Sequence, residues 1–334
     1  MEKKALSSLL LMLMVVFNLT GENCKALDPS DTDDFITIEC TLRPIERKSH
    51  SPYQQLAHAP MLQESTDSTS VNWSGYAAIT GTSAQPNPTY DSVTEVSGSW
   101  KVPTLIPNVN GDTFSSAWVG IDGYVSPTVE QIGTNHFVIN GEPVYEAWFS
   151  LYPAATQLID GFPVSPGDII EGRVVYRGQD FSGNGIFCLT IKNRTQNVKF
   201  STTQHTLPGQ PAHLSSAEWI VEAPGIVDPR IPCINLAFLP LANFNTIPFY
   251  QCEAKINGLE GGIDNRHWTF DAITMVSNSI IKAIPSALSR GGDDSCRSSC
   301  HSSKSSKSKG NNFDVIWESP GPFPFQVYCP PIVP

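Results

Sequence analysis

Glu218 is a candidate proton carrier on a short apolar segment, residues 217–222. If this segment is a β-strand, its period of two places Glu218 and Glu222 on one face and Trp219 on the other. The apolar face would pack on a core, and the carboxyls would face solvent or a groove. A glutamate titrates near pH 4.3 and so can both take and give a proton in mild acid. The simplest alternative is an ordinary solvated strand residue.

Gln131 lies on a second apolar segment, residues 129–135, and carries a non-titrating polar group. The same alternation over residues 129–135 places Gln131 on the face opposite Glu130. A glutamine amide donates through its NH₂ group and accepts through its oxygen. It can hold an oxyanion and orient a water without titrating. Here too, a solvated strand residue is the simpler interpretation.

The common signatures of other hydrolases are missing from the sequence. There is no G-x-S-x-G elbow, no H-E-x-x-H zinc helix, no Asp-Thr-Gly or Asp-Ser-Gly, and no glycine-rich phosphate loop. The sequence therefore gives no support to serine, zinc-dependent or pepsin-like chemistry.

The elements that must position these residues are short. From Val71 onward, apolar runs alternate with turn residues, and the chain contains 24 Gly and 27 Pro. The runs cover 96–103, 117–121, 129–139, 144–152, 169–176, 186–191 and 217–221. Most are too short for helices, and several alternate with period two. We expect an all-β protein of two antiparallel sheets packed face to face.

The N-terminus is typical of an exported protein. Lys3 and Lys4 precede an apolar run over 9–17 that is too short to span a bilayer. We predict a signal peptide over 1–21 and a secreted, extracellular protein. No later stretch is apolar enough for a membrane helix.

Residues 22–68 differ in composition from the rest. An acidic cluster is followed by a basic one and then by a polar stretch, which together could build little core. Composition favours a propeptide and a disordered spacer equally. Residues 69–334 form the predicted catalytic domain, with a flexible Ser/Lys loop at about 290–311 and a Pro-rich tail.

Charge and cysteine content bear on the binding partners of the protein and on the compartment in which it works. The net charge of -11 and pI of about 5.0 argue against a nucleic-acid partner and suit a protein that works in acid. The eight cysteines fit export, and we expect the six from Cys188 onward to be oxidised, with no connectivity assigned. Cys296, Cys300 and His301 resemble a metal motif, but a disulfide is favoured, so we predict no metal and no cofactor. Asn72 and Asn193 begin glycosylation sequons.

Several motifs together resemble the glutamic peptidase (eqolisin) family. They are Ala-Trp-Val-Gly-Ile-Asp-Gly at 117–123, Gln-x-Gly at 131–133, Tyr-x-Ala-Trp-x-x-x-Tyr-Pro at 145–153 and Ala-Glu-Trp-Ile-Val-Glu at 217–222. Their order and spacing match over 71–224 and more loosely to about 281. The resemblance implies a concanavalin-like, lectin-like sandwich of two antiparallel sheets with a concave substrate groove.

The resemblance also implies roles for individual residues. The catalytic glutamate falls on Glu218 and the catalytic glutamine on Gln131. The residues expected to line the substrate groove are Trp73, Trp118, Asp122, Glu146 and Tyr152. The expected activity is a pepstatin-insensitive acid endopeptidase without a cofactor.

The implied chemistry is hydrolysis by this acid–amide pair. Glu218 would deprotonate water and then protonate the leaving amine, while Gln131 stabilises the oxyanion. The reverse order, with protonated Glu218 acting first as an acid, is also open. We further hypothesise that Glu222 raises the pKa of Glu218 by charge repulsion.

Three positions depart from the family pattern. Glu130 replaces an apolar residue, and Asn135 and Ser150 stand where acids are frequent. They leave the catalytic pair intact but bear on cleavage preference and pH optimum.

The resemblance favours the propeptide interpretation of 22–68. Arg43, Arg47 and Lys48 could pair with the acidic domain until acid protonates its carboxylates. We predict a monomer that binds polypeptide substrates, is inhibited by its own propeptide, and processes itself in acid near 60–70.

Two other functions fit the same fold. A carbohydrate-binding or glycoside-hydrolysing module would need two carboxylates, about 5–9.5 Å apart for a glycosidase, and Glu218 with Glu146 or Asp122 could supply them. Gln131 opposite the acid has no purpose in a glycosidase. A catalytically dead interaction protein would not need to keep the pair.

Overall fold

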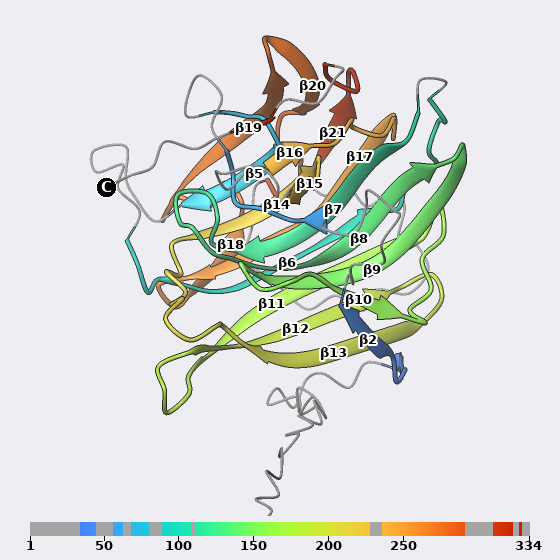
Figure 1. Ribbon diagram of the computed structural model, residues 1–334. Coiled ribbons are helices and arrows are strands. Elements are labelled where there is room, and N and C mark those ends of the chain that lie inside the picture. Colours follow the sequence, from blue (N-terminus) through green and yellow to red (C-terminus); the bar gives the residue numbers. More distant parts are fainter. Residues whose placement is uncertain are drawn as a thin grey trace, which may run out of the picture.

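The computed structural model describes residues 34–44, 56–62, 68–79, 89–108, 111–227, 236–290, 310–322 and 327–328 (Figure 1). These residues contain strands and no helix, so the predicted all-β class is confirmed. No helix within them is long and apolar enough to cross a bilayer. The predicted signal peptide, Arg47, Lys48, nearly all of the Ser/Lys loop and most of the Pro-rich tail lie outside the described residues.

One sheet carries the candidate catalytic residues, and we call it the site sheet. Its neighbouring strands pair antiparallel throughout. In spatial order they are β2 (Thr41–Pro44), β10 (Gln157–Asp160), β9 (Glu142–Tyr152), β8 (Val129–Ile139), β7 (Thr113–Ile121), β14 (Ser216–Glu222), β5 (Trp73–Ile79) and the first part of β19 (Thr269–Ser277).

The second sheet, the back sheet, lies behind it. It runs through β1 (Ile36–Thr37), β13 (Val198–His205), β12 (Gly185–Asn193), β11 (Ile169–Gln179), β6 (Val93–Lys101), β17 (Thr246–Ile256), β21 (Phe313–Trp317) and β20 (Ile280–Pro285) to the second part of β19, which also pairs with β4 (Thr69–Ser70). The short β18 (Leu259–Gly262) forms a hairpin with β17. Because β19 pairs in both sheets, the hydrogen-bond ladder is continuous from one sheet to the other.

A separate small sheet lies at one end of the site sheet. It consists of β3 (Leu56–Ala57), β15 (Gly225–Val227), β16 (Leu236–Phe238) and β22 (Val327–Tyr328). Its first strand comes from the N-terminal region, and β15 directly follows β14 of the site sheet. This arrangement brings residues 56–57 next to the segment that directly follows the strand carrying Glu218.

Tryptophan side chains connect the two large sheets. Their rings are buried between the sheets, and each indole N–H donates a hydrogen bond to an acceptor on the opposite sheet. Trp219 of the site sheet donates to the backbone oxygen of Ser97 at 2.7 Å. Trp100 of the back sheet donates to the Thr134 hydroxyl at 2.9 Å. The period-two prediction for 129–135 and 217–222 is confirmed, because Ile132 and Trp219 lie in the main core while Ile220 lies in a second cluster on the other face.

The N-terminal region is ordered where it is described. β1 pairs in parallel with β13, and β2 pairs antiparallel with β10. Residues 34–44 thus extend both large sheets.

Two sequence expectations need correction. Cys188 is disulfide-bonded, but Cys252 is a free, buried thiol, so the cysteines from Cys188 onward are not all oxidised. Asn72 and Asn193 are fully buried, and the side-chain amide of each donates hydrogen bonds inside the fold. Neither sequon is therefore accessible to glycosylation in the folded protein.

Candidate active site

Gln131 and Glu218 lie at the same level of the site sheet, with one strand between them. Gly120 of β7 pairs with Gln131 of β8 on one side and with Glu218 of β14 on the other. Two strand spacings of about 4.8 Å separate the two backbones. Both side chains stand on the face opposite the main core, so they approach each other over a residue that has no side chain.

The absence of a side chain at residue 120 is needed at this point. A Cβ atom there would lie 3.1 Å from the Cβ of Gln131 and 2.9 Å from the ring of Trp118. Glycine at position 120 therefore leaves free the space between the Gln131 amide and the Glu218 carboxyl.

Glu218 is fully buried in this structure. Neither of its carboxyl oxygens has a hydrogen bond of normal geometry with the described residues. Burial raises the pKa of Glu218 well above its usual value; the Ser216 hydroxyl opposes this shift, and the charges of Asp122 and Glu130 add to it. The hypothesis that Glu222 supplies this repulsion is wrong, because the contributing acids are Asp122 and Glu130.

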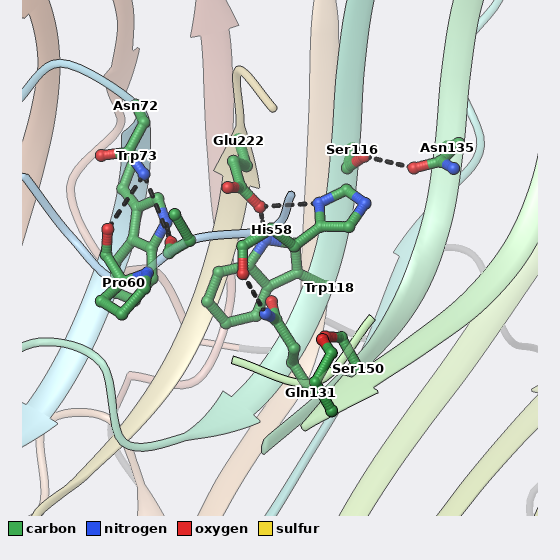
Figure 2. Close-up of polar contacts among 12 residues, drawn as sticks. His58, Pro60, Asn72, Trp73, Ser116, Trp118, Gln131, Asn135, Ser150 and Glu222 are labelled. Carbon is green, nitrogen blue, oxygen red and sulfur yellow. Dashed lines mark hydrogen bonds and ion pairs between the residues drawn. The ribbon is translucent and has the colours of Figure 1, made fainter. Parts of the chain in front are cut away.

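Gln131 is also buried, and its amide nitrogen has a specific partner. Its Nε2 donates to the backbone oxygen of His58 at 2.7 Å (Figure 2). Its Oε1 has no partner among the described residues. The amide therefore holds a peptide carbonyl with one end and leaves its acceptor free at the other.

Aromatic side chains form the walls around this pair. Trp73, Trp118 and Trp148 are fully buried and belong to one apolar cluster with Ile220. Trp73 and Trp118 meet edge to face, with ring centroids 4.9 Å apart. Trp118 donates through Nε1 to Glu222 Oε2 at 2.9 Å, which fixes this carboxylate on the face that carries Glu218.

Comparison with known proteins assigns the chain to a family. Residues 71–286 match the model of the Peptidase A4 family. This chain belongs to the Peptidase A4 family. The match covers both strands that carry the catalytic candidates, and the resemblance to glutamic peptidases is confirmed.

Individual relatives of this Peptidase A4 protein are distant. Scytalidopepsin B of Scytalidium lignicola is 27% identical over 49% of this chain, and the alignment spans 61% of that protein, less than two thirds of its length. Aspergillopepsin-2 of Aspergillus niger is 26% identical over 64% of this chain and 75% of its own. A crystal structure of scytalido-glutamic peptidase with a transition state analog inhibitor shares the fold, with a TM-score of 0.55 and 20% identity over 74% of this chain and 98% of the other.

Asp122 of this Peptidase A4 protein makes a structural contact. Its two carboxylate oxygens accept four hydrogen bonds at 2.7–2.9 Å from the backbone of His213, Leu214 and Ser215 and from the Ser215 hydroxyl. The carboxylate thus clamps the turn that leads into β14. A direct substrate contact of Asp122 stays a prediction.

Glu146 and Tyr152 lie on β9, on the flank of the site. Glu146 lies 4.0 Å from Arg43 of the N-terminal region. Burial raises the pKa of Glu146, and Arg43 and Asn135 oppose this shift. Tyr152 is half-buried against the cluster that contains the three tryptophans. Both positions are compatible with the predicted groove lining.

The three departures from the family pattern have distinct environments. Glu130 points into the sandwich core, fully buried, and neither carboxyl oxygen has a partner among the described residues. Burial raises the pKa of Glu130 well above its usual value, and the Asp122 charge adds to the shift. Asn135 accepts a hydrogen bond from the Ser116 hydroxyl at 2.6 Å. Ser150 pairs with Gln131 across β8 and β9.

The described residues contain no group of three or more His, Cys, Asp and Glu side chains arranged to hold a metal ion.

Residues 58–62, which we call the strap, cross the site, and sequence reasoning did not find their contacts. Asn72 donates through Nδ2 to the backbone oxygens of Ala59 at 3.3 Å and Pro60 at 3.2 Å (Figure 2). Trp73 donates through Nε1 to the same Ala59 oxygen at 3.1 Å. The only sequence signal for this contact was the propeptide interpretation of 22–68, which gave no register for the segment.

Proposed function

We propose that this protein is a secreted acid endopeptidase that hydrolyses peptide bonds with Glu218 and Gln131. The observation that carries the proposal is their common register across Gly120, with the Gln131 amide already holding a peptide carbonyl. Family membership favours a peptide substrate over the carbohydrate alternative. The concanavalin-like arrangement with a concave groove is part of the same proposal.

The raised pKa of Glu218 bears on the order of proton transfers. A neutral carboxyl can donate its proton to the substrate carbonyl oxygen while its other oxygen takes a proton from the attacking water. The water oxygen bonds to the carbonyl carbon and gives a neutral tetrahedral intermediate. The same carboxyl then gives a proton to the amide nitrogen as the C–N bond breaks and recovers one from a hydroxyl. Burial of Glu218 supports this order over the one that begins with ionised Glu218.

Gln131 supplies a fixed donor in this scheme. Its Nε2 would stay hydrogen-bonded to the carbonyl oxygen while that oxygen becomes a hydroxyl, and its free Oε1 would accept from the attacking water. Because an amide does not titrate, this contribution is constant through the acid range.

We further propose that residues 22–68 are an inhibitory propeptide of a monomeric enzyme whose catalytic domain is 69–334. The strap lies over the catalytic pair, and the Arg43 guanidinium pairs with Asp160 at 2.7 Å. These contacts support the role predicted for Arg43.

Digestion of a denatured protein at about pH 3, with pepstatin present, tests the activity. We expect cleavage by wild type, a loss of about 10²–10³-fold in Gln131→Ala, and a loss of about 10²–10⁴-fold or more in Glu218→Gln.

Matched controls are Gln179→Ala and Glu142→Gln, because both residues lie on exposed strand ends. These variants should keep wild-type rates. Full activity of folded Glu218→Gln would overturn the proposal, as would complete inhibition of wild type by pepstatin.

A further inference from the structure

The strap lies in the site in the manner of a bound peptide. It continues β3, where Ala57 pairs with Gly225. Downstream, the Met61 amide donates to the Gly123 oxygen at 2.9 Å. The Leu62 amide donates to the Asn72 side chain at 3.0 Å, and its oxygen accepts from the Val71 amide at 2.9 Å. Backbone hydrogen bonds thus hold the segment on both sides of the catalytic pair.

One backbone carbonyl of the strap is hydrogen-bonded to the Gln131 amide, as the carbonyl of a substrate peptide would be in the proposed mechanism. The His58 oxygen accepts from Gln131 Nε2, while the next carbonyl, that of Ala59, is held by Trp73 and Asn72. The peptide carbon whose oxygen the Gln131 amide holds is therefore the His58 carbonyl carbon. The bond that follows it joins His58 to Ala59.

The His58 side chain fills a pocket of its own. Its imidazole stacks on the Trp148 indole, with ring centroids 3.5 Å apart and planes within 5°. Its Nδ1 lies 2.9 Å from Glu222 Oε2, the oxygen that also accepts from Trp118 Nε1. The ring is fully buried. The pocket thus combines a flat aromatic wall with one acceptor within hydrogen-bond distance of a ring nitrogen.

This chemistry selects among side chains. Phenylalanine would stack on Trp148 but would leave the buried Glu222 oxygen without its second donor, and leaving a buried acceptor unpaired is costly. Alanine would lose both contacts. Histidine satisfies both, and its N–H can donate to the carboxylate.

We propose that the chain first cleaves itself between His58 and Ala59, inside the proposed propeptide 22–68, and that the pocket of Trp148, Glu222 and Trp118 selects histidine at the same position of other substrates. This inference rests on the proposed peptidase function. One water is consumed, the C–N bond breaks, and the products are a His58 carboxyl terminus and an Ala59 amino terminus. No oxidant, metal or second substrate is required.

The first test uses the full-length chain, purified at neutral pH and brought to about pH 4. Intact mass and N-terminal sequencing should show a chain that begins at Ala59, formed at a rate independent of protein concentration. His58→Ala should slow this cleavage by about tenfold or more. His267→Ala, which changes an exposed histidine away from the site, should process as wild type does.

A second test does not depend on whether the His58 variant folds. Mature wild-type enzyme is given two matched peptides, Leu-Ala-His-Ala-Pro-Met and the same peptide with Phe in place of His. We expect kcat/KM to favour the His peptide by about tenfold or more, with cleavage after His. In Glu222→Gln, this preference should shrink.

The outcomes separate the two levels of the proposal. Glu218-dependent digestion of a denatured protein, combined with a different new N-terminus or equal rates on both peptides, would overturn the His58–Ala59 assignment and leave the peptidase intact. No Glu218-dependent digestion of any substrate would overturn the peptidase itself.

Discussion

Gln131 and Glu218 face each other across Gly120, each one strand away from it in the same register. The hydrogen-bond ladder, more than any local conformation, sets their separation. A catalytic pair built in this way depends on three consecutive strands keeping their alignment. Changes to the middle strand should therefore affect activity even when neither catalytic residue is itself substituted.

Gly120→Ala tests this dependence. The new methyl would lie 3.1 Å from both the Gln131 Cβ and the Glu130 oxygen, so the β8 backbone must shift. A misplacement approaching 1 Å can cost about 10²-fold in rate. We expect kcat to fall by about 10–10²-fold, measured on a peptide substrate at acid pH. Thermal unfolding checks that the variant is folded, and wild-type kcat in the folded variant would contradict the alignment argument.

The pH dependence of kcat distinguishes the two orders of proton transfer. If catalysis needs neutral Glu218, activity is full below the pKa of this carboxyl and declines as pH rises through it. Since burial raises this pKa, the decline should lie above the ordinary glutamate value of about 4.3. A kcat that instead decreases as pH is lowered toward 3 would favour the order that begins with ionised Glu218.

Glu130→Gln should stabilise the protein at neutral pH. The pKa of Glu130 is raised in the folded state, so between its unfolded and folded pKa values the folded protein binds a proton that the unfolded chain has lost. Stability from this group is complete below about pH 4.3 and is lost as pH rises through the folded pKa. We expect the free energy of unfolding of the variant to exceed that of wild type by about 1–3 kcal/mol at pH 7, with little difference near pH 4.

Comparing Glu130→Gln with wild type at the same pH separates the contribution of Glu130 to stability from that of other buried titratable groups. Burial lowers the pKa of His136 to about 3, so its contribution is lost as pH falls. That contribution is common to both proteins and cancels in their difference. Glu142→Gln, on the exposed end of β9, is the matched control and should change stability little at either pH. Equal destabilisation of Glu130→Gln at both pH values would refute the prediction.

The sequence predicted the strands and which face of the sheet each candidate residue occupies. It predicted few of the contacts between residues that are distant in the sequence. Alternation in 129–135 and 217–222 assigned Gln131 and Glu218 to faces correctly, because a strand has only two faces. Register between strands distant in sequence is set by packing of the whole sheet, so the Gly120 alignment was not predictable. His58 carried no pattern at all, since its role arises from where a separate segment comes to rest.

Asp122 illustrates the same limit. Its place in a family motif predicted a groove residue, which stays a prediction, but gave no sign that its carboxylate holds the turn before β14. In Asp122→Asn, one acceptor oxygen becomes an NH₂ group that confronts backbone donors. We expect the free energy of unfolding to drop by about 2–3 kcal/mol, measured by chemical denaturation. Activity should fall too, because this turn positions the strand that carries Glu218; a variant of unchanged stability would count against the clamp.

Arg43→Ala should make a small, measurable change in maturation. Arg43 pairs with Asp160 through two nitrogens, at 2.7 and 3.1 Å, but both side chains are substantially exposed. Exposed ion pairs contribute less than about 1 kcal/mol, so release of the N-terminal region should speed up by less than about fivefold. The measurement is the rate at which precursor disappears after acidification.

Arg194→Ala, which removes a surface pair with Glu171 on the back sheet, is the matched control and should leave the rate unchanged. Added salt should accelerate wild type toward the variant, because exposed charges are screened. A change of a hundredfold would instead mean that Arg43, more than the strap, keeps the precursor closed.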